Sequence, residues 1–346
     1  MTSTRLTFEL PPSLEATVPP EARGLARDAV RLLVAHRESG ELVHTTFRHL
    51  PQFLDAGDLV VVNTSATIPA AIDARGTDGS DAVIHLSTCL TEGLWVVEPR
   101  RREGQGSARW SDGTVPRRFE LGRRASVELM EPFLESNRLW VARLSLPTAT
   151  LAWLAVHGRP IRYSYVEQAW PLSSYQNVYA TEPGSAEMPS AGRPLSMRVI
   201  TELVAKGVSV APIVLHTGVA SLEADEHPYP ERVRVPPSTA AHINETHRAG
   251  GRVIAVGTTV VRAVETAAGH DGIVAPVDDW TDLIVTPERG VRAIDGIVTG
   301  WHEPAASHLD LLEAIARPDL LQRSYEASLA AGYLWHEFGD SHLVIP

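Results

Sequence analysis

Short runs of consecutive apolar residues, separated by helical patterns, recur along much of this 346-residue chain. These runs show no alternation with polar residues, which is typical of strands buried on both faces of a sheet. We expect four such strands, at residues 58–63, 208–215, 252–256 and 296–299. Pro212 lies within the second run and favours an edge or irregular position, because proline donates no hydrogen bond to a neighbouring strand.

Four segments with apolar residues at helical spacing lie between or after these strands. The expected helices cover residues 197–206, 260–268, 307–316 and 320–331. Each is followed or stopped by a helix-ending residue, in order Gly207, Gly269, Pro318 and Gly332. Continuous apolar strands with intervening helices predict an α/β domain, built on a mixed sheet with helices on both faces.

The stretch from residue 73 to residue 151 has a different pattern. It contains short candidate strands at 82–86, 94–98, 125–130 and 139–146, separated by Gly, Asp and Ser, and it has few helix signals. This pattern predicts a small antiparallel β-barrel-like domain. We expect it to be inserted into the α/β domain, whose two segments would then be residues 1–72 and 152–346.

The composition is that of a soluble globular protein, with 44% hydrophobic and 21% charged residues. No apolar run approaches the roughly 18 residues of a membrane helix, and the first residues lack an apolar stretch of signal-peptide length. A single cysteine, Cys89, allows no intrachain disulfide and no cysteine-based metal site. We expect a cytoplasmic protein without a membrane partner, present as a monomer or a weak homo-oligomer.

Charge is distributed unevenly. The formal net charge of −11 argues against a general nucleic-acid coat protein. The stretch Arg100–Arg124, however, holds eight arginines against three acidic residues. Such a basic surface on an acidic body can attract a phosphate polymer. The alternative is a solvated, arginine-rich β surface, and charge alone leaves both open.

Polar residues follow all four predicted strands of the α/β domain. In open α/β sheets, ligands bind outside the carboxyl ends of the strands. Small polar residues at these positions also serve as turn and cap residues, so their meeting at one edge would be the stronger sign. The four sets are Asn63-Thr64-Ser65, His216-Thr217-Gly218, Gly257-Thr258-Thr259 and Thr299-Gly300-Trp301-His302.

The turn at Gly257 has the clearest chemistry. Glycine allows close backbone approach to a ligand, and two threonines then open a helix, where free amide groups favour an anion such as a carboxylate or phosphate. A plain threonine N-cap is the alternative. Arg262 and Glu265 are three residues apart on the same helix, so they can simply pair with each other.

His216 and His302 are candidates for acid–base work, because imidazole titrates near neutral pH, although either can be structural. Asp340 follows a glycine and can cap or orient; His336 and Glu337 are candidates of lower rank. We expect no metal site, since the 14 histidines include no His-Glu-x-x-His and no helical pair four apart. The segments Trp301-His-Glu303 and Trp335-His-Glu337 repeat each other, which we interpret as coincidence unless they meet in space.

One block carries a family resemblance. Residues 251–265, Gly-Arg-Val-Ile-Ala-Val-Gly-Thr-Thr-Val-Val-Arg-Ala-Val-Glu, closely resemble the signature of the tRNA ribosyltransferase-isomerase family of the queuosine pathway. Tyr175-Gln-Asn-Val-Tyr-Ala180 and Leu215-His-Thr-Gly218 resemble two further family motifs. Shorter matches follow the same order along the chain, at residues 8–11, 31–34, 57–64, 68–70, 295–302 and 338–340.

The resemblance implies an α/β domain with an inserted β-barrel-like domain, which agrees with the pattern described above. It also implies an enzyme that uses S-adenosylmethionine as a ribosyl donor and co-substrate, with no metal. The acceptor would be 7-aminomethyl-7-deazaguanine in tRNA, the products epoxyqueuosine, adenine and methionine, and the basic stretch Arg100–Arg124 the tRNA contact.

The matched positions then suggest individual roles. His216, His302 and Asp340 would be catalytic, with the two histidines moving protons. The substrate-binding set would be Asn63, Thr64, Tyr175, Gln176, Thr217, Gly218, Gly257, Thr258, Thr259, Arg262 and Glu265.

The chain departs from the family pattern inside several motifs. A motif histidine is replaced in Ala191-Gly-Arg-Pro194, a second is missing from His227-Pro-Tyr-Pro-Glu231, and an expected arginine is Ala66. Asn-Phe-His-Leu-Pro becomes Gly300-Trp-His-Glu-Pro304, and the glycine-rich run after His216 becomes Gly218-Val-Ala-Ser-Leu222. Two alternatives therefore stay open: a divergent paralogue that uses S-adenosylmethionine on a free nucleoside or other small acceptor, and an inactive RNA-binding relative.

Overall fold

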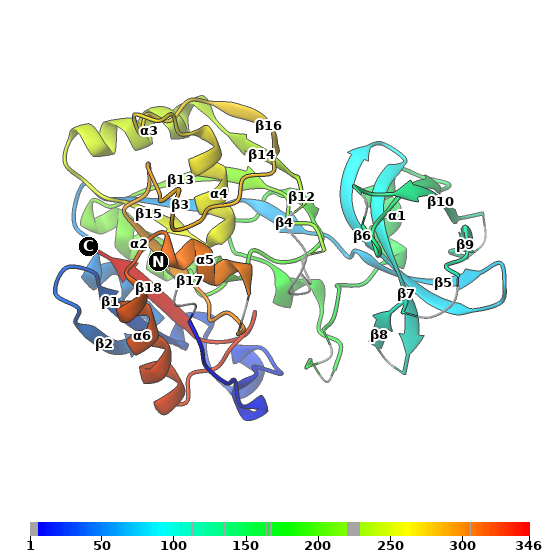
Figure 1. Ribbon diagram of the computed structural model, residues 1–346, viewed down its shortest axis with the longest axis horizontal. Coiled ribbons are helices and arrows are strands. Elements are labelled where there is room, and N and C mark those ends of the chain that lie inside the picture. Colours follow the sequence, from blue (N-terminus) through cyan, green and yellow to red (C-terminus); the bar gives the residue numbers. More distant parts are fainter. Residues whose placement is uncertain are drawn as a thin grey trace.

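The computed structural model shows an α/β body beside a β-barrel, joined through the short paired strands β4 (Ser65–Thr67) and β12 (Glu182–Ser185) (Figure 1). The described residues are 6–104, 106–111, 114–122, 124–134, 136–163, 165–166, 168–219, 229–304 and 306–346. Arg123 of the basic stretch, His227 and residues 220–222 lie outside them.

The α/β body is built on a mixed sheet. Its four central strands run parallel to one another, and the flanking strands add antiparallel pairs. The strand order is β16 (Val277–Thr281), β14 (Glu231–Val235), β13 (Ser209–Leu215), β3 (Leu59–Asn63), β15 (Val253–Val256), β17 (Gly296–Thr299), β18 (Ser341–Ile345), β1 (Arg31–His36) and β2 (Leu42–Thr46).

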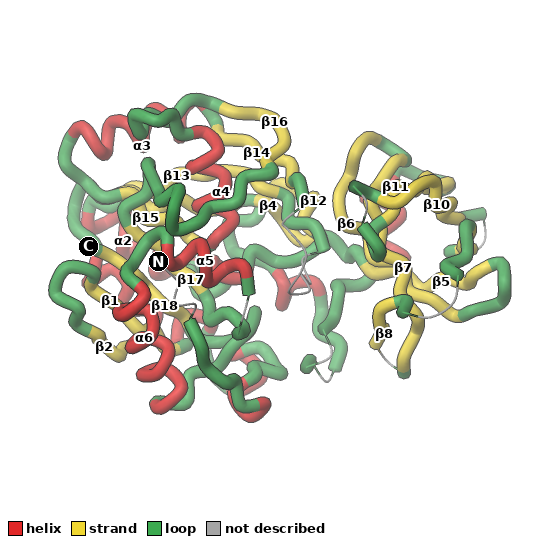
Figure 2. Tube along the Cα trace, in the orientation of Figure 1, coloured by secondary structure: helices red, strands yellow, loops and turns green. Residues whose placement is uncertain are grey.

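Helices cover both faces of this sheet, because successive residues of its buried strands point to opposite sides. Leu59 and Val61 of β3 pack on one face, and Val60 and Val62 on the other. The first face is covered by α3 (Pro237–Arg248), α4 (Thr258–Ala267), α5 (Ser307–Glu313) and α6 (Pro318–Ala330). The second is covered by α2 (Met197–Lys206) and the 3₁₀ segment η4 (Phe47–Phe53) (Figure 2). The predicted α/β architecture is confirmed.

The predicted helix ends are confirmed at two glycines and wrong at a third. Gly207 and Gly332 follow α2 and α6 with φ of 90° and 69°, the left-handed conformation that glycine adopts without strain. Gly269 does not cap α4, which begins at Thr258 and ends at Ala267, where Ala268 turns to extended backbone.

Pro212 lies on an interior strand of the sheet, but at a position paired on one side only, so the expectation of an edge or irregular position holds locally. β13 pairs with β3 over Ser209–Ile213, but it pairs with β14 only at Val214 and Leu215. The proline therefore lies where β13 has a ladder on one side only, and its missing N–H removes no bond to β14.

The second body confirms the predicted antiparallel barrel. Its strands are β5 (Ala71–Gly76), β6 (Asp81–Thr91), β7 (Leu94–Glu103), β8 (Gly106–Arg109), β9 (Arg118–Glu120), β10 (Ser126–Pro132) and β11 (Trp140–Ser145). β11 pairs with both β10 and β7, which closes the barrel. Trp153 and Leu154 of α1 (Thr150–His157) join its apolar core. The residue limits expected for the insert stay a prediction.

Candidate active site

The carboxyl ends of β3, β13 and β15 meet around Asn63. Its Nδ2 donates to the carbonyl of Leu215 at 2.8 Å, and its Oδ1 accepts from the amide of Leu215 at 3.0 Å. The same Nδ2 lies 3.4 Å from Oγ1 of Thr259, directly after β15. Beside Asn63, Thr64 donates its hydroxyl to the carbonyl of Ile213 at 3.1 Å. The predicted strand ends therefore do converge, and Asn63 and Thr64 connect them.

A cavity of about 400 Å³, which we call the central cavity, opens at this edge. Its walls come from the ends of β13, β15 and β17, from the segment that leads out of the barrel, and from the start of α5. Predicted site residues in its lining are Tyr175, Thr217, Gly257, Thr258, Thr259 and His302. This is the position at which open α/β sheets bind ligands.

Helix α4 begins in the wall of the central cavity. Gly257 is its N-cap, with φ of 96° and ψ of 156°, a conformation that side-chain-bearing residues rarely adopt. No side chain caps the helix, so the threonine N-cap alternative is wrong. The first-turn amides and the hydroxyls of Thr258 and Thr259 therefore form a site suited to an anionic group.

Gly218 and Thr217 link this wall to the barrel. The amide of Gly218 donates to Glu231 Oε1 at 3.0 Å, and Thr217 Oγ1 donates to the carbonyl of Glu187 at 2.6 Å. A Cβ on Gly218 would stand 2.7 Å from Oγ of Ser87 on β6, so glycine is required for this close approach.

His302 and His308 stack face to face in the central cavity, with ring centroids 4.6 Å apart and an interplanar angle of 2°. Nε2 of His302 lies 2.9 Å from Oγ1 of Thr299. Burial holds the pKa of His302 well below its ordinary value and lowers the pKa of His308 to about 4. Both imidazoles are therefore neutral at pH 7, and burial makes each a weaker base than a solvated imidazole.

A second aromatic stack also lines the central cavity. Tyr163 stacks on Tyr165 at 5.6 Å, and Tyr165 stacks on His336 at 4.0 Å. The hydroxyl of Tyr165 donates to Glu337 Oε2 at 2.6 Å, and Tyr163 is hydrogen-bonded to Glu187. Two carboxylates are thus held at the cavity wall by two tyrosines.

The two Trp-His-Glu segments meet in space. The rings of Trp301 and Trp335 lie 5.4 Å apart, and Nε1 of Trp335 donates to the carbonyl of His302 at 3.2 Å. Both segments contribute residues to the central cavity, so the interpretation of their likeness as coincidence is not supported by the geometry.

His216 is not among the described residues that line the central cavity. Its Nδ1 is 2.7 Å from Oγ of Ser65, and its ring fills the space beside Gly184, where a Cβ would come within 2.5 Å. Burial lowers its pKa. Its catalytic role stays a prediction.

Three other predicted residues make framework contacts. Gln176 bridges both backbone groups of Thr67, accepting from its amide at 3.0 Å and donating to its carbonyl at 2.6 Å. Asp340 accepts from the amides of Arg31 and Leu334 at 2.7 and 2.8 Å. Glu265 is fully buried against Arg289, so the alternative in which it pairs with Arg262 is wrong.

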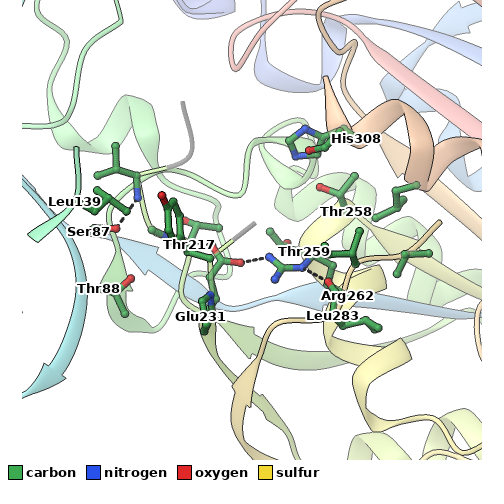
Figure 3. Close-up of a pocket in the computed structure, with 18 of the residues that line it drawn as sticks. Ser87, Thr88, Leu139, Thr217, Glu231, Thr258, Thr259, Arg262, Leu283 and His308 are labelled. Carbon is green, nitrogen blue, oxygen red and sulfur yellow. Dashed lines mark hydrogen bonds and ion pairs between the residues drawn. The ribbon is translucent and has the colours of Figure 1, made fainter. Parts of the chain in front are cut away.

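A second, smaller pocket of about 110 Å³, the side pocket, lies between the barrel and the α/β body (Figure 3). Ser87 and Leu139 line it from the barrel, and Thr259 lines it from α4. Arg262 forms an ion pair with Glu231 in its wall and donates to the carbonyl of Leu283 at 3.1 Å. The side pocket shares Thr217, Thr258, Thr259, Ser307 and His308 with the central cavity, so the two adjoin.

Sequence reasoning missed Tyr163, Tyr165, Glu187 and His308. The two tyrosines lie in an irregular stretch between the barrel and α/β patterns, where no strand end marks them. His308 follows His302 by six residues at the start of an expected helix, which was the available signal.

In the described part of the chain, no group of three or more His, Cys, Asp or Glu side chains is arranged to hold a metal ion. Across the same residues, no helix is both long and apolar enough to span a bilayer.

Known proteins of one family match this chain over nearly its whole length. The sequence model of the family described as "Queuosine biosynthesis protein" matches residues 3–344. The S-adenosylmethionine:tRNA ribosyltransferase-isomerase of Symbiobacterium thermophilum is 33% identical over 353 residues, and that of Moorella thermoacetica 34% over 349, each alignment covering 98% of both chains. The crystal structure of S-adenosylmethionine tRNA ribosyltransferase from Thermotoga maritima matches with a TM-score of 0.55 at 26% identity, covering 98% of this chain and 99% of that one.

Proposed function

Since this chain belongs to the queuosine biosynthesis protein family, we propose that it is an S-adenosylmethionine:tRNA ribosyltransferase-isomerase, the activity named for its relatives. In this reaction the ribosyl moiety of S-adenosylmethionine passes to 7-aminomethyl-7-deazaguanine in tRNA and isomerises. Epoxyqueuosine forms, and adenine and methionine leave.

The observation that carries the proposal is the central cavity. The block that most resembles the family, residues 251–265, supplies Gly257, Thr258 and Thr259 to its wall, where the ends of β13 and β17 also meet. Full-length similarity to relatives named for this activity supports the family reaction over the two alternatives, a small-acceptor paralogue and an inactive RNA-binding relative.

S-adenosylmethionine carries a carboxylate, an ammonium and a sulfonium. Its carboxylate fits the start of α4, because the amides of Thr258 and Thr259 precede the first intrahelical hydrogen bonds, which Val260 and Val261 donate to Gly257. The hydroxyls of Thr258 and Thr259 add donors at the same place. This end of the cavity therefore anchors the methionine part of the co-substrate.

His302 is the base that the cavity offers. The sulfonium acidifies the adjacent C5′ hydrogens, and a neutral imidazole accepts a proton. Burial keeps His302 neutral by lowering its pKa, and its contact with Oγ1 of Thr299 orients the ring. His308, stacked on it, excludes water from one face.

The barrel offers a surface for tRNA. Arg117 and Arg118 are exposed on and beside β9, and the guanidinium of Arg117 lies 4.9 Å from the centre of the Trp140 ring. Arg101 lies over Trp110 at 4.5 Å. Arginine stacked on an aromatic ring can contact both phosphates and bases of RNA. The acceptor tRNA would place the enzyme in the cytoplasm.

The test is release of adenine from S-adenosylmethionine. The purified protein is incubated with the co-substrate alone, with the free 7-aminomethyl base, and with tRNA that carries this base. We expect adenine and epoxyqueuosine only with the tRNA. Release with the free base would support the small-acceptor alternative, and no release in any arm would contradict the proposal.

Variants assign the proton roles in the same assay. We expect His302→Gln to slow adenine release at least about 100-fold, the usual size of a general-base contribution. Full activity of His216→Ala would remove His216 from the catalytic set, leaving it the packing role that its contacts indicate.

A further inference from the structure

The central cavity has an acidic lining. Three glutamates line it, Glu187, Glu303 and Glu337, and no lysine or arginine is among its described lining residues. Its three histidines, His302, His308 and His336, have pKa values lowered mainly by burial, so they add no positive charge at pH 7. Away from the start of α4, the electrostatics of the cavity favour a cation.

Two of these carboxylates are held by hydrogen bonds, and Glu337 is also desolvated by burial. Glu337 accepts from the Tyr165 hydroxyl at 2.6 Å, and Glu187 is hydrogen-bonded to Tyr163. Each tyrosine hydrogen bond occupies one acceptor position of its carboxylate, and a carboxylate can accept several hydrogen bonds. Burial raises the pKa of Glu337, whereas the Tyr165 hydrogen bond and the charge of Arg193 act to lower it, and Arg193 is itself paired with Glu21 at 2.7 Å. The two carboxylates therefore keep acceptor capacity for a ligand.

Trp301 gives an independent sign that a ligand completes this wall. It lines the same cavity and is only 3% exposed, yet its Nε1 has no hydrogen-bond partner among the described residues. A buried indole N–H ordinarily finds an acceptor. The Tyr163 ring, which stacks on Tyr165 with one face, also provides a face that attracts cations.

We propose that Glu187 and Glu337 select the positively charged group of a substrate, an alkyl sulfonium or a primary ammonium, and hold it against the tyrosine stack. This inference rests on the proposed function, because that function supplies two cationic substrates. When the cation belongs to S-adenosylmethionine, the start of α4 and the two carboxylates bind opposite charges of one zwitterion, which sets the orientation of the co-substrate.

Calorimetric titration of paired ligands that differ in charge tests the proposal. The first pair is S-adenosylmethionine and its neutral-sulfur analogue S-adenosylhomocysteine, with tRNA carrying an unmodified guanine present. The second pair is tRNA carrying 7-aminomethyl- or 7-cyano-7-deazaguanine. The proteins are wild type, Glu337→Gln, Glu187→Gln and the double variant.

We expect the double variant to lose about tenfold or more in affinity for the charged member of a pair and little for the neutral one, since hydrogen bonds to charged groups are the stronger ones. If the double variant loses affinity for S-adenosylmethionine alone, the bound cation is the sulfonium. If it loses affinity for the aminomethyl tRNA alone, the bound cation is the acceptor ammonium. Equal loss for both S-adenosyl compounds, without change for either tRNA, identifies the methionine ammonium.

Two controls separate charge from packing. Glu303→Gln removes a carboxylate whose side chain is 61% exposed, so solvent screens it and charge selectivity should stay. Tyr165→Phe removes the bond to Glu337 but keeps the carboxylate, so selectivity should be weakened rather than lost.

Three results would overturn the proposal. They are unchanged affinities in the double variant, equal losses for charged and neutral ligands of both pairs, and equal loss of selectivity in Glu303→Gln. A wild-type protein that binds neither S-adenosyl compound nor either tRNA would overturn the proposed function together with this inference. Normal wild-type binding with unchanged variants would overturn this inference alone.

Discussion

Glu265 illustrates how a residue in the family-like block can serve the framework and not the cavity. Its carboxylate pairs with Arg289 at 2.8 Å and accepts from the amides of Arg292 and Ala293 at 2.8 and 2.9 Å. It faces the loop before β17, away from the central cavity lining. Motif membership alone could not distinguish this position from Thr258, which does line the cavity.

Replacing Glu265 tests this distinction. Glu265→Ala leaves Arg289 and two amides without their buried partner, so we expect a loss of about 3–5 kcal/mol in unfolding free energy, measured by urea denaturation. The folded fraction should still bind S-adenosylmethionine. Asp319→Ala, which breaks an exposed pair with Arg317, should cost less than about 1 kcal/mol. Normal stability with lost binding would return Glu265 to the substrate site.

From the burial of His342 on β18 we expect the stability of the folded protein to depend on pH. The ring is fully buried, stacks on Trp301 at 4.7 Å, and has no hydrogen-bond partner at either nitrogen among the described residues. Burial lowers its pKa to about 3. The unfolded chain binds a proton at this histidine below about pH 6.5, whereas the folded protein does so only near pH 3, so stability is lost as pH falls through that window.

We therefore expect His342→Leu to flatten the pH dependence of unfolding. Between about pH 5.5 and pH 4.5 the slope of the unfolding free energy should drop by about 1.4 kcal/mol per pH unit, the contribution of one proton. Urea denaturation at several pH values measures it. Exposed His270 provides the matched control, and an equal change in slope for His270→Leu would contradict the burial argument.

At the scale of elements, most of the located elements have strong local patterns, although the apolar strands β1 and β18 were missed. Strands β3, β13, β15 and β17 are nearly all apolar, and α2 ends at Gly207, so these elements were located closely. β14 and β16 were missed because charged residues interrupt their apolar positions. Helix α3 was missed because its polar sequence gives only a weak helical period. Their structure depends on tertiary pairing, which a local pattern does not contain.

The start of α4 is the element whose geometry most directly serves the site. Gly257→Ala would place a Cβ 3.3 Å from Ala191 and force φ of 96° and ψ of 156° on a residue with a side chain. We expect a loss of about 1–3 kcal/mol in stability and at least about a tenfold loss in S-adenosylmethionine affinity. Denaturation and calorimetry measure these two effects.

Gly250 provides the control for this substitution. It also has a left-handed φ, of 79°, but an added Cβ would meet nothing within 4 Å, and it lies at the end of α3. Gly250→Ala should cost stability of about the same size without changing affinity. If both variants lost affinity equally, backbone strain and not the helix terminus would explain the result.

At the scale of the whole molecule, the central cavity could not be predicted from the sequence. Tyr163, Glu187 and Glu337 come from segments far apart in sequence, and only the assembled fold brings them to one cavity. The sheet edge itself could be anticipated, because parallel strands share the direction of their carboxyl ends. The acidic character of the cavity could not, since the whole-chain charge says nothing about which acids face inward.

The position of the barrel leads to the last prediction. Helix α3 lies on the far side of the α/β body from the barrel (Figure 1). If tRNA binds the barrel, Arg117→Ala with Arg118→Ala should weaken tRNA binding. The slope of log affinity against log salt should also fall by about 0.7–0.9 for each phosphate that the variant no longer neutralises.

Arg248→Ala removes an exposed arginine from α3 and should change neither quantity. Filter binding between about 50 and 200 mM salt measures both. Equal effects from the two sites would mean that net charge, and not the barrel surface, attracts the tRNA.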